Sequence, residues 1–162
     1  MNYWLMKSEP ETFGIEHLKQ RPKKIEPWDG VRNYQARNMM RDDMQVGDKA
    51  FFYHSNCAEP GIVGIVEIVK AGYPDVTALD PESDYYDPKA TPENPRWYRV
   101  DVRLSRRLHR PITLTELKQH REALGDFALL RQGNRLSVLP VTAAQWALIL
   151  MLDAGLTPPI QK

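Results

Sequence analysis

The chain has 162 residues, of which 42% are hydrophobic and 27% charged, and its formal net charge is +1 at pH 7. This length predicts one domain, 1–162, and the near-neutral charge excludes a protein that coats nucleic acid through its overall field. A single cysteine, Cys57, rules out an internal disulfide and indicates a reducing, cytoplasmic location. We expect no membrane span, because no apolar run approaches about 20 residues. We also expect no signal peptide, because the chain begins without a basic region followed by a long apolar run.

The first half of the chain alternates short apolar runs with glycine and proline, which is typical of a small sheet with short helices. It predicts a strand at 3–7, a helix at 12–19, a loop at 21–27, a helix at 33–41, and strands at 49–54 and 62–69. Within the second helix, the expected inner residues are Tyr34, Ala36 and Met40. The two later strands form a hairpin around 55–61, and Gly64 indicates a bulge or a closely approaching neighbour.

The second half begins with a segment that contains too many prolines to form a helix or a strand. Residues 73–95 contain five prolines and are expected to form a long, ordered loop. Thr-x-x-Glu at 113–116 and Thr-x-x-Gln at 142–145 are capping boxes that open helices. The remaining pattern predicts a strand at 96–104, a helical turn at 126–131, a strand at 134–140 and a last helix that ends at 153. The fold class is therefore α+β, with a small, strongly curved or closed sheet and peripheral helices.

The stretch 27–38, Pro-Trp-Asp-Gly-Val-Arg-Asn-Tyr-Gln-Ala-Arg-Asn, is the densest in groups suited to recognition. Trp28 offers a flat face and one N–H donor, and Gly30 allows a tight turn or a close approach. Arginines such as Arg32 can bind a phosphate or lie over a ring, and amides such as Asn33 can read a base edge. Such a set is typical of a nucleotide or nucleic-acid site. The alternative is a core tryptophan, an ordinary turn and a solvated helix face.

A catalytic site has weak support in the sequence. His54 and Ser55 are adjacent on a strand end, where neighbouring side chains point to opposite faces, and no nucleophile-elbow motif is present. Ser55 and Asn56 either cap the loop or give polar contacts to a ligand near Trp28. Cys57 and the scattered histidines have no metal-ligand spacing, and no phosphate-binding glycine loop occurs. We therefore expect no metal and no cofactor.

Three further features have two readings each. Trp97 is either a core residue or a second aromatic wall opposite Trp28. The acidic turn 84–87 is either a solvated turn with inward tyrosines or a weak cation site. A basic set provides either surface charge or phosphate contacts around a base pocket. Its members are Arg106, Arg107, His109, Arg110, Arg131 and Arg135.

The order and spacing of several motifs resemble the EVE domain family. They are Tyr-Trp-Leu-Met-Lys-Ser-Glu-Pro at 3–10, the run 28–38, and Phe-Tyr-His-Ser-Asn at 52–56 leading into Pro-Gly-Ile-Val-Gly at 60–64. The pieces at 85–88, 95–97 and 135–138 also match, so the likeness covers nearly the whole chain. It implies a PUA-like fold, a compact mixed β-barrel with flanking helices. This family is similar to YTH domains, which hold a methylated adenine of RNA in an aromatic cage.

The resemblance also implies a set of site residues. Trp28 is the expected cage wall, with Trp97 opposite it. The other expected members line the cavity, frame its mouth or lie on its rim: Lys7, Ser8, Gly30, Val31, Arg32, Asn33, Tyr34, Tyr53, His54, Ser55 and Asn56.

The function that this resemblance implies is that of a non-enzymatic reader, which binds a modified nucleobase of DNA or RNA in an aromatic-walled pocket. The same cavity could instead serve a small-molecule-binding or protein-interaction module. A third alternative is a small hydrolase or base-processing enzyme that uses His54, Ser55 or Asp87. The partner expected is a nucleic acid with a modified base and not a membrane, whereas the oligomeric state stays open.

Overall fold

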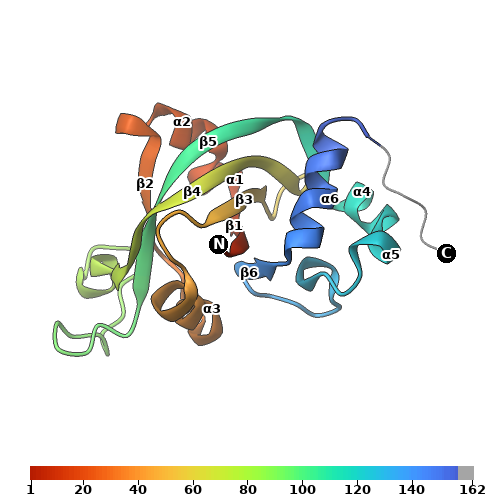
Figure 1. Cartoon of the computed structure of the whole chain (residues 1–162). Coiled ribbons are helices and arrows are strands. Elements are labelled where there is room, and N and C mark those ends of the chain that lie inside the picture. Colours follow the sequence, from red (N-terminus) through yellow and green to blue (C-terminus); the bar gives the residue numbers. More distant parts are fainter. Residues whose placement is uncertain (157–162) are drawn as a thin grey trace.

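The fold is built on one curved, six-stranded sheet with the order β2-β5-β4-β3-β1-β6. This computed structural model describes residues 1–156. The strands are β1 (Tyr3–Ser8), β2 (Ile25–Trp28), β3 (Lys49–His54), β4 (Gly61–Pro74), β5 (Tyr98–Thr113) and β6 (Val138–Val141). β1 runs parallel to β3, and every other neighbouring pair is antiparallel. The expected curved, mixed sheet is confirmed, but it is not closed into a barrel, since β2 and β6 are its edges in the described residues (Figure 1).

Short helices cover the two ends of the sheet (Figure 1). Near β2 lie α1 (Pro10–Phe13), α2 (Ile15–Gln20), the 3₁₀ turn η1 (Pro22–Lys24), α3 (Tyr34–Asn38) and the π-helical turn η2 (Met39–Asp43). Near β6 lie α4 (Leu114–Gln119), α5 (Arg121–Leu124), η4 (Ala128–Leu130) and α6 (Ala143–Asp153), while η3 (Val76–Leu79) follows β4. Among residues 1–156, no helix has the length and apolar character that a membrane crossing requires.

Two separate clusters of buried side chains form the core, one on each face of the sheet. Successive residues of a strand point to opposite faces, so Phe51 and Phe52 are both fully buried but belong to different clusters. The first cluster packs under α2, α3 and η2, with residues such as Leu18 from α2 and Met40 from η2. The second packs under α4 and α6, where Trp146 lies.

Two predictions for the region before β3 differ from the structure, one for a helix and one for a loop. The predicted helix at 12–19 is broken at Gly14 into α1 and α2. The predicted loop at 21–27 contains η1 and most of β2, a strand that pairs with β5 at the sheet edge. Pro27 is tolerated there because an edge strand has one side with no hydrogen bonds to supply. Of the expected inner residues of the next helix, Ala36 and Met40 are buried, but Tyr34 is 49% exposed.

The long strands β4 and β5 extend well beyond their predicted lengths, and shifts in their pairing register interrupt the ladder at several points. Gly64 lies at one such shift, and an added Cβ there would come within 2.3 Å of Ile15 Cδ1. Both readings of this glycine, a bulge and a close neighbour, are therefore confirmed. The capped helices also form: Thr113 caps α4, and Thr142 with Gln145 forms a complete capping box on α6.

Candidate functional site

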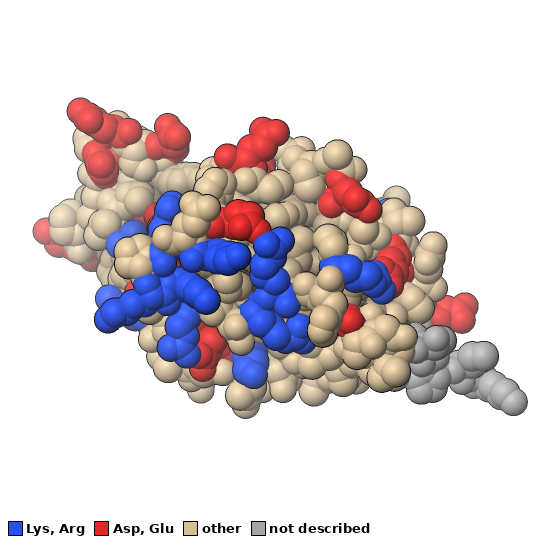
Figure 2. Space-filling view, turned by 90° about the horizontal axis from the view of Figure 1, so that it is seen from above, with Lys and Arg blue, Asp and Glu red and all other residues tan. Residues whose placement is uncertain are grey.

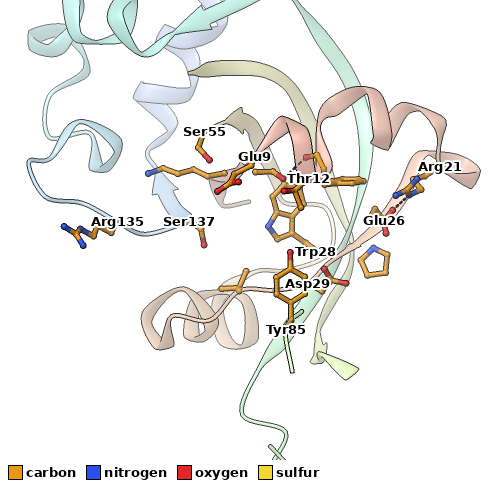
Figure 3. Close-up of a pocket in the computed structure, with 16 residues that line it drawn as sticks. Glu9, Thr12, Arg21, Glu26, Trp28, Asp29, Ser55, Tyr85, Arg135 and Ser137 are labelled. Carbon is orange, nitrogen blue, oxygen red and sulfur yellow. Dashed lines mark hydrogen bonds and ion pairs between the residues drawn. The ribbon is translucent and has the colours of Figure 1, made fainter. Parts of the chain in front are cut away.

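A cavity of about 590 Å³ lies at the ends of β1 and β3. Because these strands are parallel, Lys7 and Ser8 at the end of β1 come together with Ser55, which directly follows β3. The stretch 26–31, from β2 onward, supplies another wall, and residues of α1 complete it (Figure 3). Its volume is within the range of pockets that bind small ligands.

Trp28, the last residue of β2, borders this cavity although its side chain is only 6% exposed. Its ring meets Phe52 at 5.3 Å and 81° and Phe13 at 6.4 Å and 87° between ring centroids and planes. These T-shaped contacts hold the indole in one orientation. In Figure 3 the indole nitrogen faces the cavity, and within residues 1–156 it has no hydrogen-bond partner. The ring is therefore positioned to accept a flat group and to donate one hydrogen bond.

Tyr85 is the second aromatic side chain of the cavity, and it comes from the long loop between η3 and β5. Its ring lies against the backbone of Gly30, where an added Cβ would be 2.6 Å from the ring. Gly30 also has φ +77°, so both the turn and the close approach favour glycine at this position. In Figure 3 the Tyr85 hydroxyl points toward Trp28. Burial raises the pKa of the Tyr85 phenol, with Asp29 adding to the effect, so the hydroxyl stays a donor at neutral pH.

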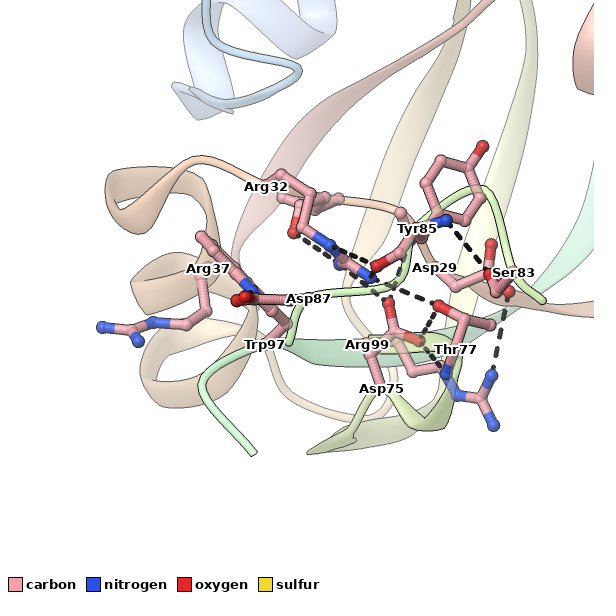
Figure 4. A network of polar contacts seen from close by, with 12 residues as sticks. Asp29, Arg32, Arg37, Asp75, Thr77, Ser83, Tyr85, Asp87, Trp97 and Arg99 are labelled. Atoms are coloured by element: carbon pink, nitrogen blue, oxygen red, sulfur yellow. Dashed lines mark hydrogen bonds and ion pairs between the residues drawn. The ribbon is translucent and has the colours of Figure 1, made fainter. Parts of the chain in front are cut away.

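A buried ion pair holds the Tyr85 loop against the Trp28 turn (Figure 4). Asp75 is 0% exposed and accepts hydrogen bonds from Gly30 N (3.0 Å), Arg32 Nη1 (3.1 Å) and the amide and hydroxyl of Thr77. Arg32 in turn donates to the Tyr85 carbonyl oxygen through Nη2 (2.8 Å) and Nε (3.2 Å). The guanidinium thus joins two segments that are far apart in the sequence, and it fixes the spacing of the two aromatic walls.

Two carboxyl groups near the cavity are shifted in opposite directions. Burial alone would raise the pKa of Asp75, but its hydrogen bonds from Thr77, Gly30 and Arg32 outweigh this effect, and the pKa lies below its usual range. Burial raises the pKa of Asp29, and the neighbouring Asp75 raises it further. Arg99, 3.7 Å from Asp29, opposes the rise. Asp75 is therefore a fixed anion of the scaffold.

Charged groups on the cavity rim fall into paired and unpaired sets. Arg21 and Glu26 form an ion pair at one end of the cavity (Figure 3). Lys7 and Arg135 also line the cavity, but neither has a carboxylate partner within 4.0 Å in the described part of the chain. Burial lowers the pKa of Lys7, which favours its neutral form relative to a free lysine. These two cations are free to meet a negatively charged group.

The other basic side chains are largely neutralised. Figure 2 shows Lys and Arg side chains gathered on the face that lies uppermost in Figure 1, where β5 and α2 are found. β5 contributes four exposed arginines that all pair with carboxylates: Arg103, Arg106, Arg107 and Arg110. Their carboxylate partners are Glu67, Asp153, Glu16 and Glu116. For this part of the basic set, the reading as surface charge is favoured.

The structure brings six of the expected site residues together around the cavity: Lys7, Ser8, Trp28, Gly30, Val31 and Ser55. Trp97 is not the second wall. Its ring stacks on Tyr34 (4.9 Å, 20°), and its Nε1 donates to Asp87 Oδ2 (2.7 Å). Arg32 and Tyr34 do not frame the mouth in the way expected, because Arg32 is used in the Asp75 network and Tyr34 packs on Trp97.

Four more expected residues lie outside the cavity lining and have structural contacts. Asn33 caps α3 by accepting from Ala36 N (3.0 Å). Tyr53 is buried in the second core cluster, and its burial raises the phenol pKa to about 12. His54 Nε2 accepts from Ile15 N (3.1 Å), and Asn56 donates to Glu9. These contacts position α1 and the loop after β3, which are parts of the wall.

Sequence reasoning missed Tyr85 as a wall and Asp29 as a lining residue, and it named Arg135 only as part of a basic set. One signal was available for Tyr85. A glycine two residues after a recognition tryptophan indicates that something lies close to its backbone, and Tyr85 is in the long loop predicted at 73–95. The pairing of these two segments over more than 50 residues depends on Arg32, which local patterns cannot show.

The hydrolase alternative lacks the geometry that it needs. Ser55 lines the cavity, whereas His54 and Asp87 do not. The His54 Nε2 lone pair is already used by Ile15 N, and burial followed by the charge of Arg107 lowers the His54 pKa. Asp87 pairs with Arg96 (3.3 Å) and accepts from Trp97. The three groups share no cavity in which one could activate another.

The sequence model of the family described as EVE domain matches residues 2–152. The chain belongs to the EVE domain family. Thymocyte nuclear protein 1 of Danio rerio is 49% identical over 166 residues, which cover 93% of this chain and 71% of the relative. This EVE chain thus shares its domain with a eukaryotic protein that is longer than the matched region.

Solved structures place the same fold in bacteria and in humans. A protein of Pseudomonas syringae has 52% identity and a TM-score of 0.88, over 93% of this chain and 99% of the other. Human THYN1, in complex with DNA that contains 5-methylcytosine, has 43% identity and a TM-score of 0.91, over 98% and 100%. A YTH domain of Zygosaccharomyces rouxii, at 17% identity and a TM-score of 0.54, is similar in fold alone, over 99% and 89%. The chain and this YTH domain are therefore similar in the arrangement of their helices and strands.

Proposed function

We propose that this EVE domain is a non-enzymatic reader that binds a modified nucleobase of a nucleic acid in the cavity between Trp28 and Tyr85. The observation that carries this proposal is the pair of aromatic rings on an open cavity, with the free cations Lys7 and Arg135 on the rim. The likeness to human THYN1, which was solved with DNA containing 5-methylcytosine, supports DNA as the first polymer to test.

Simple energetics agree with a flipped base as the ligand. Extrusion of a paired base costs a few kcal/mol, and stacking on an aromatic side chain returns roughly 1–3 kcal/mol per base. Burial of one methyl group adds about 0.8 kcal/mol, which corresponds to a preference of about fourfold for a methylated base. Because an unpaired base needs no extrusion, single-stranded ligands should bind more tightly than duplexes with the same modification.

The test is a titration of short oligonucleotides that differ by one methyl group. Single-stranded DNA with one 5-methylcytosine is compared with its cytosine counterpart, and RNA with one N6-methyladenosine with its adenosine counterpart. The wild-type chain should prefer the methylated member of at least one pair. Tyr85→Ala should abolish this preference, since it removes one wall of the cavity.

Tyr86→Ala is the matched control, because Tyr86 is the next residue in the same loop, is 42% exposed and does not line the cavity. Equal affinity of the wild-type chain for both members of every pair would contradict the reader function. Turnover of an oligonucleotide would favour a base-processing enzyme instead. Tight binding of a free small molecule that no oligonucleotide displaces would favour a small-molecule module.

A further inference from the structure

The arginines of the described chain divide into a large paired group and a small unpaired one. Residues 1–156 include thirteen arginines, and ten of them have a carboxylate oxygen within 4.0 Å. In this described part, the three without such a partner are Arg37, Arg121 and Arg135. Arg135 lines the Trp28–Tyr85 cavity, and Arg37 is connected to Tyr85 through a series of stacked side chains.

Arg135 is at the cavity itself, in the segment that leads into β6 (Figure 3). It is exposed, and Ser137, two residues later, lines the same wall. Since Arg135 has no carboxylate to neutralise it, its guanidinium is available to a ligand at the rim.

Arg37 is mounted on an aromatic stack at the outer side of α3. Its guanidinium carbon lies 4.6 Å from the centroid of the Tyr34 ring, which is itself stacked on Trp97 at 4.9 Å. Nη1 of Arg37 donates to the Arg96 carbonyl oxygen (2.8 Å), and Nε and Nη2 donate to the Asn38 amide oxygen (3.1 and 2.8 Å). All these partners are uncharged, so they fix the direction of the guanidinium without forming an ion pair. Within residues 1–156 no carboxylate oxygen lies within 4.0 Å of Arg37, and its charge acts on Asp42 only at longer range, where it helps Arg41 to lower the Asp42 pKa.

This stack is continuous with the cavity wall. The Arg32 guanidinium carbon lies 5.6 Å from the Tyr85 ring centroid and 5.3 Å from the Trp97 ring centroid. The groups thus follow one another as Tyr85, Arg32, Trp97, Tyr34 and Arg37, from the cavity to the surface. Figure 4 shows Tyr85 and Arg37 at opposite ends of this network, with Arg37 pointing outward. A rigid series therefore links the base pocket to a free cation outside it.

From these observations we infer that Arg37 and Arg135 form a phosphate clamp, which binds backbone phosphodiesters of the strand whose base occupies the cavity. Arg37 and Arg135 contact the phosphates, while Tyr34 acts as a positioning residue that holds Arg37 in place. The inference rests on the proposed function, because it requires a nucleic-acid strand at the cavity. A clamp of this kind adds affinity but carries no information on the modification, since every nucleotide has the same phosphate.

The experiment measures affinity against salt concentration for single-stranded DNA with one 5-methylcytosine and for its cytosine counterpart. Arg37→Gln and Arg135→Gln should each weaken binding of both DNAs by the same factor, roughly tenfold. Each should also reduce the slope of log affinity against log salt by about 0.7, the contribution of one phosphate contact to a single strand. The ratio of the two affinities should stay at its wild-type value.

Arg121→Gln is the matched control, because Arg121 is also exposed and unpaired within residues 1–156 but lies on α5, at the other end of the fold (Figure 1). It should change neither affinity nor slope. Tyr34→Leu should reproduce the slope change of Arg37→Gln, and Tyr34→Phe should keep the wild-type slope. If the stack only stabilises the loop, Tyr34→Leu will lower the melting temperature without changing the slope.

The clamp is overturned if Arg37→Gln and Arg135→Gln change the salt slope no more than Arg121→Gln does. This outcome is distinct from failure of the reader function. The reader fails when the wild-type chain does not distinguish methylated from unmethylated DNA, whatever its salt slope. The clamp fails when the distinction is present but the two arginines contribute nothing to the salt dependence.

Discussion

The two ends of the sheet contain similar residues in different arrangements. Trp146 at the α6 end and Trp28 at the cavity end are each 6% exposed. Trp146 is stacked on Phe51 (3.9 Å) and Tyr3 (4.6 Å), so aromatic partners cover its ring. Trp28 has T-shaped contacts and, in residues 1–156, no stacked partner. Two equally buried tryptophans therefore differ in whether neighbouring rings are stacked on them, and Trp28 is the one that lines the cavity.

Polar groups show the same contrast. At the α6 end, the buried Asp153 accepts from His109 N (2.7 Å) and pairs with Arg106 (2.9 Å), so its charge is balanced locally. At the cavity end, Lys7 and Arg135 have no such partner in the described chain. Neighbouring groups thus cover the Trp146 ring and balance the Asp153 charge, whereas Trp28, Lys7 and Arg135 border an open cavity. The following predictions test this difference.

The largest expected effect is that of shortening the two tryptophans. Trp28→Ala and Trp146→Ala should each lower the free energy of unfolding by about 3–5 kcal/mol, because both rings are buried. Trp28→Phe and Trp146→Phe keep an aromatic ring at each position, so they separate an effect on DNA binding from an effect on stability. Trp28→Phe should lower the affinity for methylated DNA, and Trp146→Phe should leave it unchanged, as measured by titration on folded protein. A loss of binding in Trp146→Phe would mean that the two ends are not independent.

A similar loss of stability is expected at the Asp75 network. Asp75→Ala leaves Arg32 without its charge partner in a partly buried site, and such changes cost about 3–5 kcal/mol. Because Arg32 also holds Tyr85, the variant should bind methylated DNA less tightly even at temperatures where it is folded. Chemical denaturation and titration together check both effects. At the other end, the exposed Arg131–Asp126 pair is the control, and Asp126→Ala should have almost no effect.

A smaller effect is expected from a methyl group on Gly30. Gly30→Ala combines a left-handed backbone, φ +77°, with a collision against the Tyr85 ring. Backbone strain alone costs roughly 1–3 kcal/mol. Gly47→Ala is the control for strain, because Gly47 has φ +95° and no atom within 4 Å of an added Cβ. Both variants should lower the melting temperature, but Gly30→Ala alone should reduce the affinity for methylated DNA.

The smallest effect concerns pH. Burial lowers the pKa of His54 below its usual 6.5, and His54 Nε2 must be neutral to accept from Ile15 N. The unfolded chain therefore binds a proton more readily than the folded one, and stability rises with pH through this range. The contribution of His54 is present above about pH 6.5 and is lost as the pH falls toward the lower folded pKa. The melting temperatures of the wild type and of His54→Phe, measured at several pH values, should approach each other as the pH falls. A difference that stays constant with pH would contradict this role.

Local patterns in the sequence were enough for much of the fold. A short apolar run predicted β1, aromatic content predicted β3, β-branched content predicted the first part of β4, and period-two alternation predicted the first part of β5. The Thr-x-x-Glu and Thr-x-x-Gln boxes predicted the starts of α4 and α6. These signals are reliable because they depend on neighbours a few residues away. β2 was missed, since a proline at an edge strand reads as a loop until its partner strand is known.

The sequence alone determined the fold class and the family, and it singled out Trp28, Gly30 and Val31, which the structure places on the cavity. Only the tertiary structure decided which aromatic faces Trp28. Trp97 and Tyr85 both belong to the region after η3, and both are near Arg32. The buried Asp75–Arg32 pair places Tyr85 at the cavity and Trp97 under Tyr34, through contacts that span more than 40 residues. Contacts over such distances are set by the packing of the whole sheet, and no local pattern contains them.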